Sequence, residues 1–235
     1  MQVRLRAESL TCRSSSHLLL WFESNGSHRH RRVALPDLPP DAARRTLRAR
    51  LAAQRRSLTP GERAHAAARV AQLAARTLHL RAGTRIALYA SLPHELDTAP
   101  LMALARARGC RIYLPRIDRP RSARGMRFLE MGGALRRNRL GIEEPADAAR
   151  IGARWLDLVF LPLVGFDRHG LRLGTGGGYY DRAFAFRRWR TSWHAPRLIG
   201  IGYAFQQLER IAPEAHDVRM DAVITDAGVI QCTTG

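Results

Sequence analysis

Apolar and polar positions along residues 41–235 follow two different periods. Short, nearly continuous apolar runs are typical of strands that are covered on both faces. Such runs predict strands at residues 85–90, 111–114, 157–161, 197–203 and 222–225, with 126–130 as a further candidate. Helical spacing separates several of these runs, most clearly at residues 98–108. Strands that alternate with helices predict an α/β fold: three layers, with a mainly parallel sheet and helices on both faces.

Residues that start or stop helices and strands refine the predicted boundaries of these elements. Asp41 opens the first helical pattern. The run Thr59-Pro60-Gly61-Glu62 predicts the next helix start, because Thr caps, Pro suits the first turn and Glu completes a capping box. Gly83 ends that unit, and Pro115 should stop the strand that begins at residue 111. We expect the apolar stripe of this second helix to consist of Val70, Leu73, Thr77 and Leu78.

Residues 1–40 differ from the rest of the chain. They mix Arg, Ser and His with one apolar run at residues 18–22, too short to span a bilayer and a poor match to a signal peptide. We therefore expect a disordered or non-native N-terminal extension, followed by a single α/β domain over residues 41–235. No membrane association is expected.

The charge is unusual. All 39 basic residues are Arg, against 20 acidic residues, so the formal net charge is +19. A polyanion partner is one explanation, since clustered basic charge is typical of nucleic-acid binding, and compositional drift is the other. Three widely separated cysteines, at positions 12, 110 and 232, form no zinc or disulfide pattern, as expected in the reducing cytoplasm.

The most informative segment is LRLGTGGGYYDR, residues 171–182. Its four glycines lie between a predicted strand and a helix, where the backbone can take positive φ and turn N–H groups toward an anion. We interpret this loop as a phosphate cradle, with Arg172 able to fork onto phosphate oxygens. The alternative is a plain glycine-rich turn.

Two familiar phosphate loops are excluded. A Walker A loop needs a Lys, which this chain lacks, and the dinucleotide fingerprint needs a Gly where Tyr179 stands. Asp181 falls in the first helical turn, where it could bind a Mg²⁺ that bridges phosphates or could merely cap the helix. In the first helix, Arg44, Arg48 and Arg55 fall near one another on one face.

These motifs occur together in one known family. The run LPLVGFDRHGLRLGTGGGYYDR (161–182) resembles the signature of the 5-formyltetrahydrofolate cyclo-ligases, also called 5,10-methenyltetrahydrofolate synthetases. The resemblance extends over residues 42–232 and includes ARRTLR (43–48), SLPHELDT (91–98), YLPR (113–116) and IGIGYAFQ…APEAHDVRMDAVITDAG (199–228). Residues 1–40 match nothing in the family.

The resemblance implies a fold similar to the phosphosugar-isomerase and CoA-transferase-like folds. It also implies an enzyme that converts 5-formyltetrahydrofolate to 5,10-methenyltetrahydrofolate, with ATP going to ADP and phosphate. Mg²⁺, ATP and a reduced folate would be bound by a cytoplasmic monomer. In the family's mechanism the formyl oxygen attacks the γ-phosphate, N10 closes onto the activated carbon, and phosphate leaves.

The site residues are carried over by motif position. The resemblance implies that Asp181 and Asp217 bind the metal. It implies that Glu95 and Ala90 bind the folate. The implied catalytic residues are Arg172, Tyr179 and Tyr180. His216 is expected to be structural. ATP binding falls on Arg44, Arg48, Arg172, Gly174, Thr175, Gly176, Gly177, Gly178, Tyr179 and Tyr180.

The chain departs from the family pattern at three places. Some members carry an aromatic or basic residue at the position of Thr175, and some a Lys at that of Gly177. A folate-stacking Trp of some members is replaced by Leu140 or Gly141.

Two other functions remain open. One is a different ATP-dependent ligase or phosphotransferase on this fold, since the phosphate motifs match better than the folate pocket. The other is a non-catalytic nucleic-acid-binding protein. Against the latter, Glu95, Asp181 and Asp217 all stand intact in their motifs.

Overall fold

The computed structural model describes residues 40–117, 126–132, 135–137, 143–145, 149–189 and 195–233. The predicted N-terminal extension, apart from Pro40, and the positions of Leu140 and Gly141 lie outside the described residues. The described residues belong to one compact unit.

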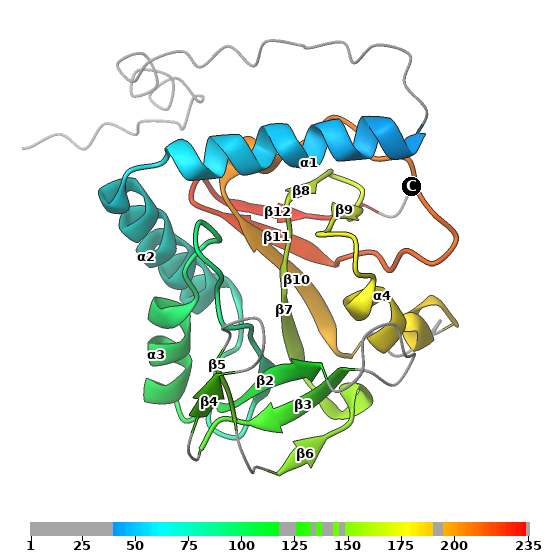
Figure 1. The fold of residues 1–235 in the computed structure, drawn as a ribbon. Coiled ribbons are helices and arrows are strands. Elements are labelled where there is room, and N and C mark those ends of the chain that lie inside the picture. Colours follow the sequence, from blue (N-terminus) through cyan, green and yellow to red (C-terminus); the bar gives the residue numbers. More distant parts are fainter. Residues whose placement is uncertain are drawn as a thin grey trace, which may run out of the picture. The chain divides into compact units, whose positions relative to one another are not determined.

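An eight-stranded mixed sheet forms the centre of this unit (Figure 1). Its strand order is β12-β11-β10-β7-β1-β2-β3-β6. Every pair from β11 to β2 is parallel, while β12, β3 and β6 join antiparallel. The strands are β1 (Arg85–Ala87), β2 (Arg111–Ile117), β3 (Met126–Glu130), β6 (Arg150–Ile151), β7 (Leu158–Pro162), β10 (Arg197–Gly202), β11 (Ala222–Thr225) and β12 (Val229–Gln231). Two small pairs stand apart: β4 (Leu135–Arg137) with β5 (Glu143–Pro145), and β8 (Gly165–Phe166) with β9 (Arg172–Leu173).

Helices cover both faces of the sheet. Successive β7 residues face opposite sides: Phe160 packs with α2 (Pro60–Thr77) and α3 (Ala99–Ala107), whereas Leu161 packs with Phe184 at the end of α4 (Tyr179–Ala183). The short helix η2 (Ala185–Trp189) adds Phe186 to this second face. The mainly parallel, three-layer α/β prediction is therefore confirmed. Two further short helices are η1 (Ala153–Trp155) and η3 (Ala204–Gln206).

The second helix begins as its sequence indicates, but its buried stripe differs. Thr59 and Glu62 form the predicted capping box, with the Glu62 N–H donating to Thr59 Oγ1 at 3.2 Å. Thr77, however, is exposed, and its hydroxyl donates to the Leu73 carbonyl oxygen at 2.8 Å. Small residues form most of the buried face instead: Ala66, Ala67, Val70, Ala71 and Ala74. The prediction for Thr77 was wrong because alanines, which allow close packing on α3 and the sheet, carry the stripe.

Pro115 does not end its strand. β2 continues to Ile117, and Pro115 is paired with Phe128 of β3. On the other side of β2, β1 is paired only as far as Tyr113. Pro115 therefore stands where one side of the strand is unpaired, so its missing N–H costs no ladder bond. The predicted stop at this residue was wrong for that reason.

The chain order creates a switch point between β1 and β7. The chain leaves β1 toward β2 on one side and β7 toward β10 on the other, so the loops at the carboxyl ends of β1 and β7 diverge. Such crevices are the usual binding sites of open parallel sheets. The first helix, α1 (Pro40–Ser57), lies across this end of the sheet and contacts β8 (Figure 1).

Among the described residues, no helix has both the length and the apolar character needed to cross a membrane.

Candidate functional site

The glycine-rich loop lies at the carboxyl end of the sheet, between β9 and α4. Gly176 and Gly178 have φ values of +100° and +60°, which side-chain-bearing residues rarely adopt. Within the described part of the chain, the backbone N–H groups of residues 174–178 donate no hydrogen bond. A row of unpaired N–H groups in such turns forms a concavity suited to anions.

The helix behind this loop begins at Tyr179, as predicted, and is short. α4 has only five residues and is followed by the 3₁₀ turn η2, so little helix dipole acts on the loop. The Arg182 guanidinium lies 5.1 Å from the Tyr179 ring centre and donates to the Gly177 carbonyl oxygen at 2.8 Å. The loop is thus fixed from behind by Arg182, while its N–H groups remain available.

Arg172 is held by other groups of the protein. Its side chain is buried, donating to Asp181 Oδ1 at 2.7 Å and to the Val218 carbonyl oxygen at 2.9 Å. Asp181 Oδ1 also accepts the Val218 N–H at 3.1 Å. This arrangement brings α4 against the segment that carries Asp217. Asp181 does lie in the first turn of α4, as predicted.

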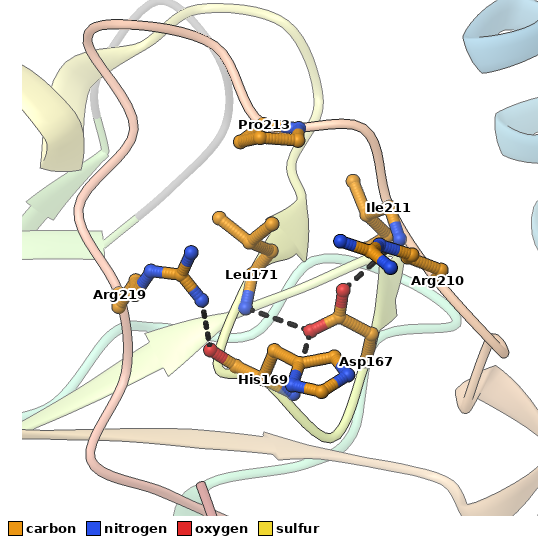
Figure 2. A pocket seen from close by; sticks show the side chains of 7 residues that line it. All are labelled: Asp167, His169, Leu171, Arg210, Ile211, Pro213 and Arg219. Carbon is orange, nitrogen blue, oxygen red and sulfur yellow. Dashed lines mark hydrogen bonds between the residues drawn. The ribbon is translucent and has the colours of Figure 1, made fainter. Parts of the chain in front are cut away.

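A fully buried carboxylate positions that same segment. Asp167 Oδ1 accepts the N–H groups of His169 and Leu171, and its Oδ2 accepts the Ile211 N–H at 3.0 Å (Figure 2). The cavity beside it is about 120 Å³, too small for a nucleotide or a folate. Asp167 therefore acts as a structural link between the β8–β9 turn and the chain that follows Ile211.

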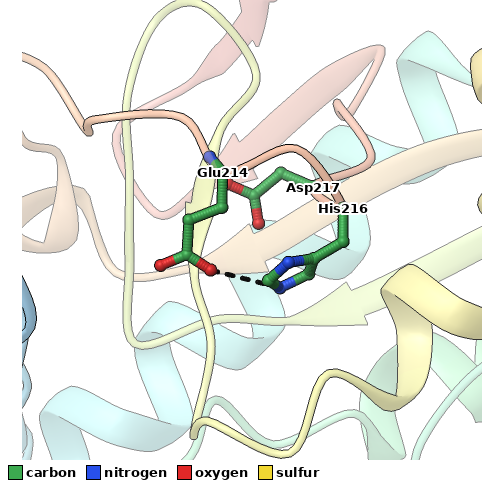
Figure 3. Close-up of side chains that lie close together, drawn as sticks. All are labelled: Glu214, His216 and Asp217. Carbon is green, nitrogen blue, oxygen red and sulfur yellow. Dashed lines mark hydrogen bonds and ion pairs between the residues drawn. The ribbon is translucent and has the colours of Figure 1, made fainter.

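The chain after Ile211 brings three possible metal ligands together. One ligand atom each from Glu214, His216 and Asp217 lies within 4.8 Å of the others. Figure 3 shows these side chains converging, with His216 Nε2 3.2 Å from Glu214 Oε2. Arg44 of α1 faces the same cluster, 2.9 Å from Glu214 Oε1 and 3.7 Å from Asp217 Oδ2.

The two carboxylates predicted to bind metal lie on neighbouring segments. Asp181 bonds to Val218, the residue after Asp217. Hydrogen bonds go to Asp181 Oδ1 and Asp217 Oδ2, which leaves Asp181 Oδ2 and Asp217 Oδ1 without a protein donor among the described residues. Free carboxylate oxygens beside a phosphate loop are the donors Mg²⁺ prefers, so the residues fit that ion.

One face of α1 carries the arginines of the site. Arg44, Arg48 and Arg55 are spaced by four and seven residues and so share a face with the fully buried Leu51. Arg48 Nε donates to the Gly174 carbonyl oxygen at 2.8 Å. Its two Nη atoms have no hydrogen-bond partner in the described chain and stand beside the glycine loop. The structure thus joins Arg48 to the loop and Arg44 to the acidic segment.

Glu95 lies on a tight turn after β1. Its N–H donates to the Leu92 carbonyl oxygen at 3.0 Å, and its Oε2 accepts the Leu92 N–H at 3.0 Å. His94, within this turn, has a φ of +68°, a left-handed conformation that costs energy in a non-glycine residue. Strain of this kind gathers at functional sites. Ala90, also expected at the folate, is half-buried at the start of the same loop.

Two tyrosines donate to the backbone of the Glu95 turn. The Tyr203 hydroxyl lies 3.4 Å from the Glu95 carbonyl oxygen, and the Tyr89 hydroxyl 3.4 Å from that of Leu96. Burial raises the pKa of Glu95, partly offset by its Leu92 hydrogen bond and by the charge of Arg55. Burial, followed by the Glu95 charge, raises the pKa of Tyr180, whose hydroxyl therefore keeps its proton. Tyr180 stands on α4, directly after the glycine loop.

A second cavity, about 500 Å³, lies elsewhere. It is lined by the chain before β1 together with Asp157 and Arg197, at the amino ends of the parallel strands. The residues that carry the family resemblance gather at the opposite, carboxyl end.

The sequence alone assigns no role to three of these residues. For Arg55 the available signal is its spacing, which puts it on the face of Arg44 and Arg48. Tyr89 and Tyr203 give no such signal, because aromatic residues at strand ends are ordinary core residues. Their hydroxyls donate to the carbonyl oxygens of Leu96 and Glu95, which lie 7 and 108 residues away along the chain.

Comparison with known proteins points to one family. The family model for the 5-formyltetrahydrofolate cyclo-ligase family matches residues 40–226. The chain is 37% identical over 150 residues to the 5-formyltetrahydrofolate cyclo-ligase of Escherichia coli K12, covering 61% of this chain and 79% of that protein. It is 32% identical over 179 residues to that of Haemophilus influenzae, covering 74% and 93%.

Solved structures give the same result. The 5,10-methenyltetrahydrofolate synthetase of Aquifex aeolicus superposes with a TM-score of 0.68 at 26% identity, covering 82% of this chain and 94% of that chain. The synthetase of Mycoplasma pneumoniae does so with a TM-score of 0.60 at 25% identity, covering 78% and 98%.

Proposed function

Since the chain belongs to the 5-formyltetrahydrofolate cyclo-ligase family, we propose that it converts 5-formyltetrahydrofolate to 5,10-methenyltetrahydrofolate, with ATP going to ADP and phosphate. The observation that carries this proposal is the meeting of three features at the carboxyl end of the sheet: the unpaired N–H groups of residues 174–178, the free Asp181 and Asp217 oxygens, and the Glu95 turn. These three features are complementary to a nucleotide, a cation and a pterin, in that order.

The phosphate side consists of the glycine loop and α1. The N–H groups of residues 174–178 and the Arg48 Nη atoms would donate to phosphate oxygens, the usual means of phosphoryl-transfer catalysis by positioning and charge neutralisation. Arg44, held by Glu214, stands at the acidic end of the same face and would act on the triphosphate there. Arg172 supports the site indirectly by holding Asp181.

Asp181 and Asp217 would hold Mg²⁺ through their free oxygens. When bound, the ion supplies charge neutralisation between the carboxylates and the triphosphate. Arg172 fixes the Asp181 side chain, and the Glu214 N–H fixes that of Asp217 at 2.8 Å, so both carboxylates are oriented before any ligand arrives.

The folate side is the Glu95 turn with its tyrosines. The Glu95 carboxylate can accept the ring N–H and amino hydrogens of a pterin. In the reaction that the resemblance implies, the formyl oxygen attacks the γ-phosphorus and ADP leaves; N10 then attacks the activated carbon, and the C–O bond breaks to release phosphate. Tyr179 and Tyr180 would act beside the phosphates, because α4 follows the phosphate loop directly.

The proposed function is tested by following methenyltetrahydrofolate formation spectrophotometrically, with and without ATP and Mg²⁺. Formation that requires both supports the proposal, whereas a purified, folded protein without activity contradicts it. The resemblance also implies a cytoplasmic monomer, which size-exclusion chromatography and fractionation would test.

Replacing Arg48 with Ala should raise the KM for ATP about tenfold or more, because charge-assisted hydrogen bonds contribute about 1.5–3 kcal/mol each. The KM for the folate should change little. Steady-state kinetics with each substrate varied in turn measures both. Arg45→Ala is the matched control, since Arg45 is exposed on the same helix. A change in the folate KM alone would show that Arg48, and with it this part of α1, acts on the folate and not on ATP.

The +19 net charge should give weak, non-specific binding to polyanions. Counterion release makes such binding fall steeply between about 50 and 200 mM salt. Fluorescence anisotropy with unrelated DNA and RNA oligomers over a salt series measures it. Binding that selects one sequence and survives high salt would favour the nucleic-acid-binding alternative.

A further inference from the structure

The cavity of about 500 Å³ at the amino ends of the parallel strands has no part in the proposed function. Three neighbouring strands, β10, β7 and β1, begin beside it, and the turn that joins α2 to β1 forms another of its walls. Cavities that bind small molecules usually measure about 300–1,000 Å³. This cavity is therefore large enough for a small molecule, at the opposite end of the sheet from the glycine loop.

The one acidic side chain among the lining residues is already fully engaged. Asp157 Oδ1 accepts Arg85 Nη2 at 2.7 Å, and its Oδ2 accepts Arg85 Nε at 3.0 Å and the Arg85 backbone N–H at 2.8 Å. Arg85 opens β1 and Arg197 opens β10, so Asp157, directly before β7, lies between two arginines. Because Arg85 takes both carboxylate oxygens, no acidic group of this cavity is left for Arg197.

Two arginines consequently line the cavity without a counter-charge. Neither exposed Arg81 nor half-buried Arg197 has a side-chain hydrogen bond or an ion pair within the described parts of the chain. Their backbones are fixed, since the Arg81 carbonyl oxygen accepts the Thr84 N–H at 3.1 Å and the Arg197 N–H donates to the Asp157 carbonyl oxygen at 3.0 Å. Like charges that line one concave wall raise the local concentration of ions of the opposite sign. The cavity therefore favours an anion.

The donors of this wall suit a phosphate group. Two guanidinium forks can bind several oxygens of one phosphate in a defined geometry. The backbone N–H groups of His79 and Ala82 also line the cavity and donate no hydrogen bond within the described chain. A phosphate dianion has enough acceptor oxygens and enough charge for all of these groups.

The rest of the lining indicates what carries the phosphate. Leu78 and Leu158 contribute apolar atoms, and the cavity has room for more than a phosphate ion. We propose that this cavity is a second anion-binding site that takes a small phosphomonoester. Arg81 and Arg197 bind its phosphate, and its organic part lies against Leu78 and Leu158. This inference does not depend on the proposed function.

The test measures binding of phenyl phosphate to the full chain by calorimetry and by the NMR signals of the His79 ring, which His79→Gln identifies. Binding should shift these signals. Arg81→Gln and Arg197→Gln should each weaken binding about 10-fold or more, since hydrogen bonds to charged groups are the strong ones. Arg76→Gln is the matched control: it removes the same charge from an exposed position outside the cavity and should change affinity less than threefold.

A second control separates this cavity from the glycine loop. Arg48→Ala alters the loop end of the sheet and should leave the shift of the His79 signals unchanged. If Arg48→Ala abolishes phenyl phosphate binding while Arg81→Gln and Arg197→Gln keep it, the ligand binds at the glycine loop and the inference is wrong. Absence of any shift at His79 contradicts it equally.

Three further outcomes overturn the inference. An equal loss in Arg76→Gln would show attraction by the net charge of the chain and no specific site. Inorganic phosphate that binds as tightly as phenyl phosphate would limit the site to the free ion. Phenol that binds as tightly would make the cavity an apolar pocket. If Arg197→Gln does not fold, Arg81→Gln decides the matter, because Arg81 is exposed.

Discussion

Asp181→Asn should fold and lose about 100-fold or more in turnover, the size of effect expected when one stabilising charge is removed from a transition state. Asn can still accept hydrogen bonds from Arg172 and from the Val218 N–H through its Oδ1, so the local structure is kept. What is lost is the negative charge and the second carboxylate oxygen, which would bind Mg²⁺. Without a cation, a carboxylate about 4 Å from a phosphate charge would cost about 4 kcal/mol at an effective dielectric of 20.

The measurement is turnover as a function of Mg²⁺ concentration, together with a thermal melt. The Mg²⁺ requirement should rise in the variant. The melting temperature should fall by a few degrees, because the buried Arg172 loses its counter-charge, and about 1 kcal/mol shifts a chain of this size by about 2–4 °C.

Asp157→Asn is the matched control. Asp157 also pairs with an arginine, Arg85, at 2.7 Å, but at the amino end of the strands. Its variant should lower the melting temperature without changing the Mg²⁺ dependence. If Asp181→Asn keeps near-normal turnover at limiting Mg²⁺, Asp181 does not bind the metal and is only a structural partner of Arg172. Asp217 would then be the remaining metal carboxylate of the predicted pair.

Glu95→Gln should raise the KM for the folate about 10- to 100-fold and leave that for ATP nearly unchanged. The amide keeps one acceptor oxygen but loses the charge and presents an NH₂ group toward the donors of the pterin. Asp97→Asn is the control in the same loop, since Asp97 is exposed and its Oδ1 accepts the Ala99 N–H at 3.0 Å, a bond that Asn can also accept. An unchanged folate KM in Glu95→Gln would move the pterin away from this turn.

The pH dependence gives a second readout of Glu95. Burial raises its pKa, so the carboxylate gains its proton at a pH above the ordinary carboxyl range. The ionised form binds the pterin donors; folate affinity should therefore fall as the pH drops through this raised pKa. Fold stability moves the other way, because a raised folded-state pKa means that the group stabilises the fold at low pH and loses this contribution as the pH rises. The acid loss of affinity should be absent in Glu95→Gln.

The local sequence determined most helices and strands. It also identified single residues of the candidate site, but not the partners that they contact. Caps, glycines and apolar runs act on the backbone within a few residues, so the capping box at Thr59, strand β3 and the start of α4 could be read directly. The motif residues Glu95, Asp181 and Asp217 were also identified from the sequence.

Only the tertiary structure decided which of these residues meet. Asp181 reaches Val218 across 37 residues, and Asp167 holds Ile211 across 44. Pro115 continues its strand because β1 has already ended beside it. Spacing along the chain fixes only neighbours within a helix or strand. Partners that come from different strands are set by the order of the strands in the sheet, which depends on how the whole core packs.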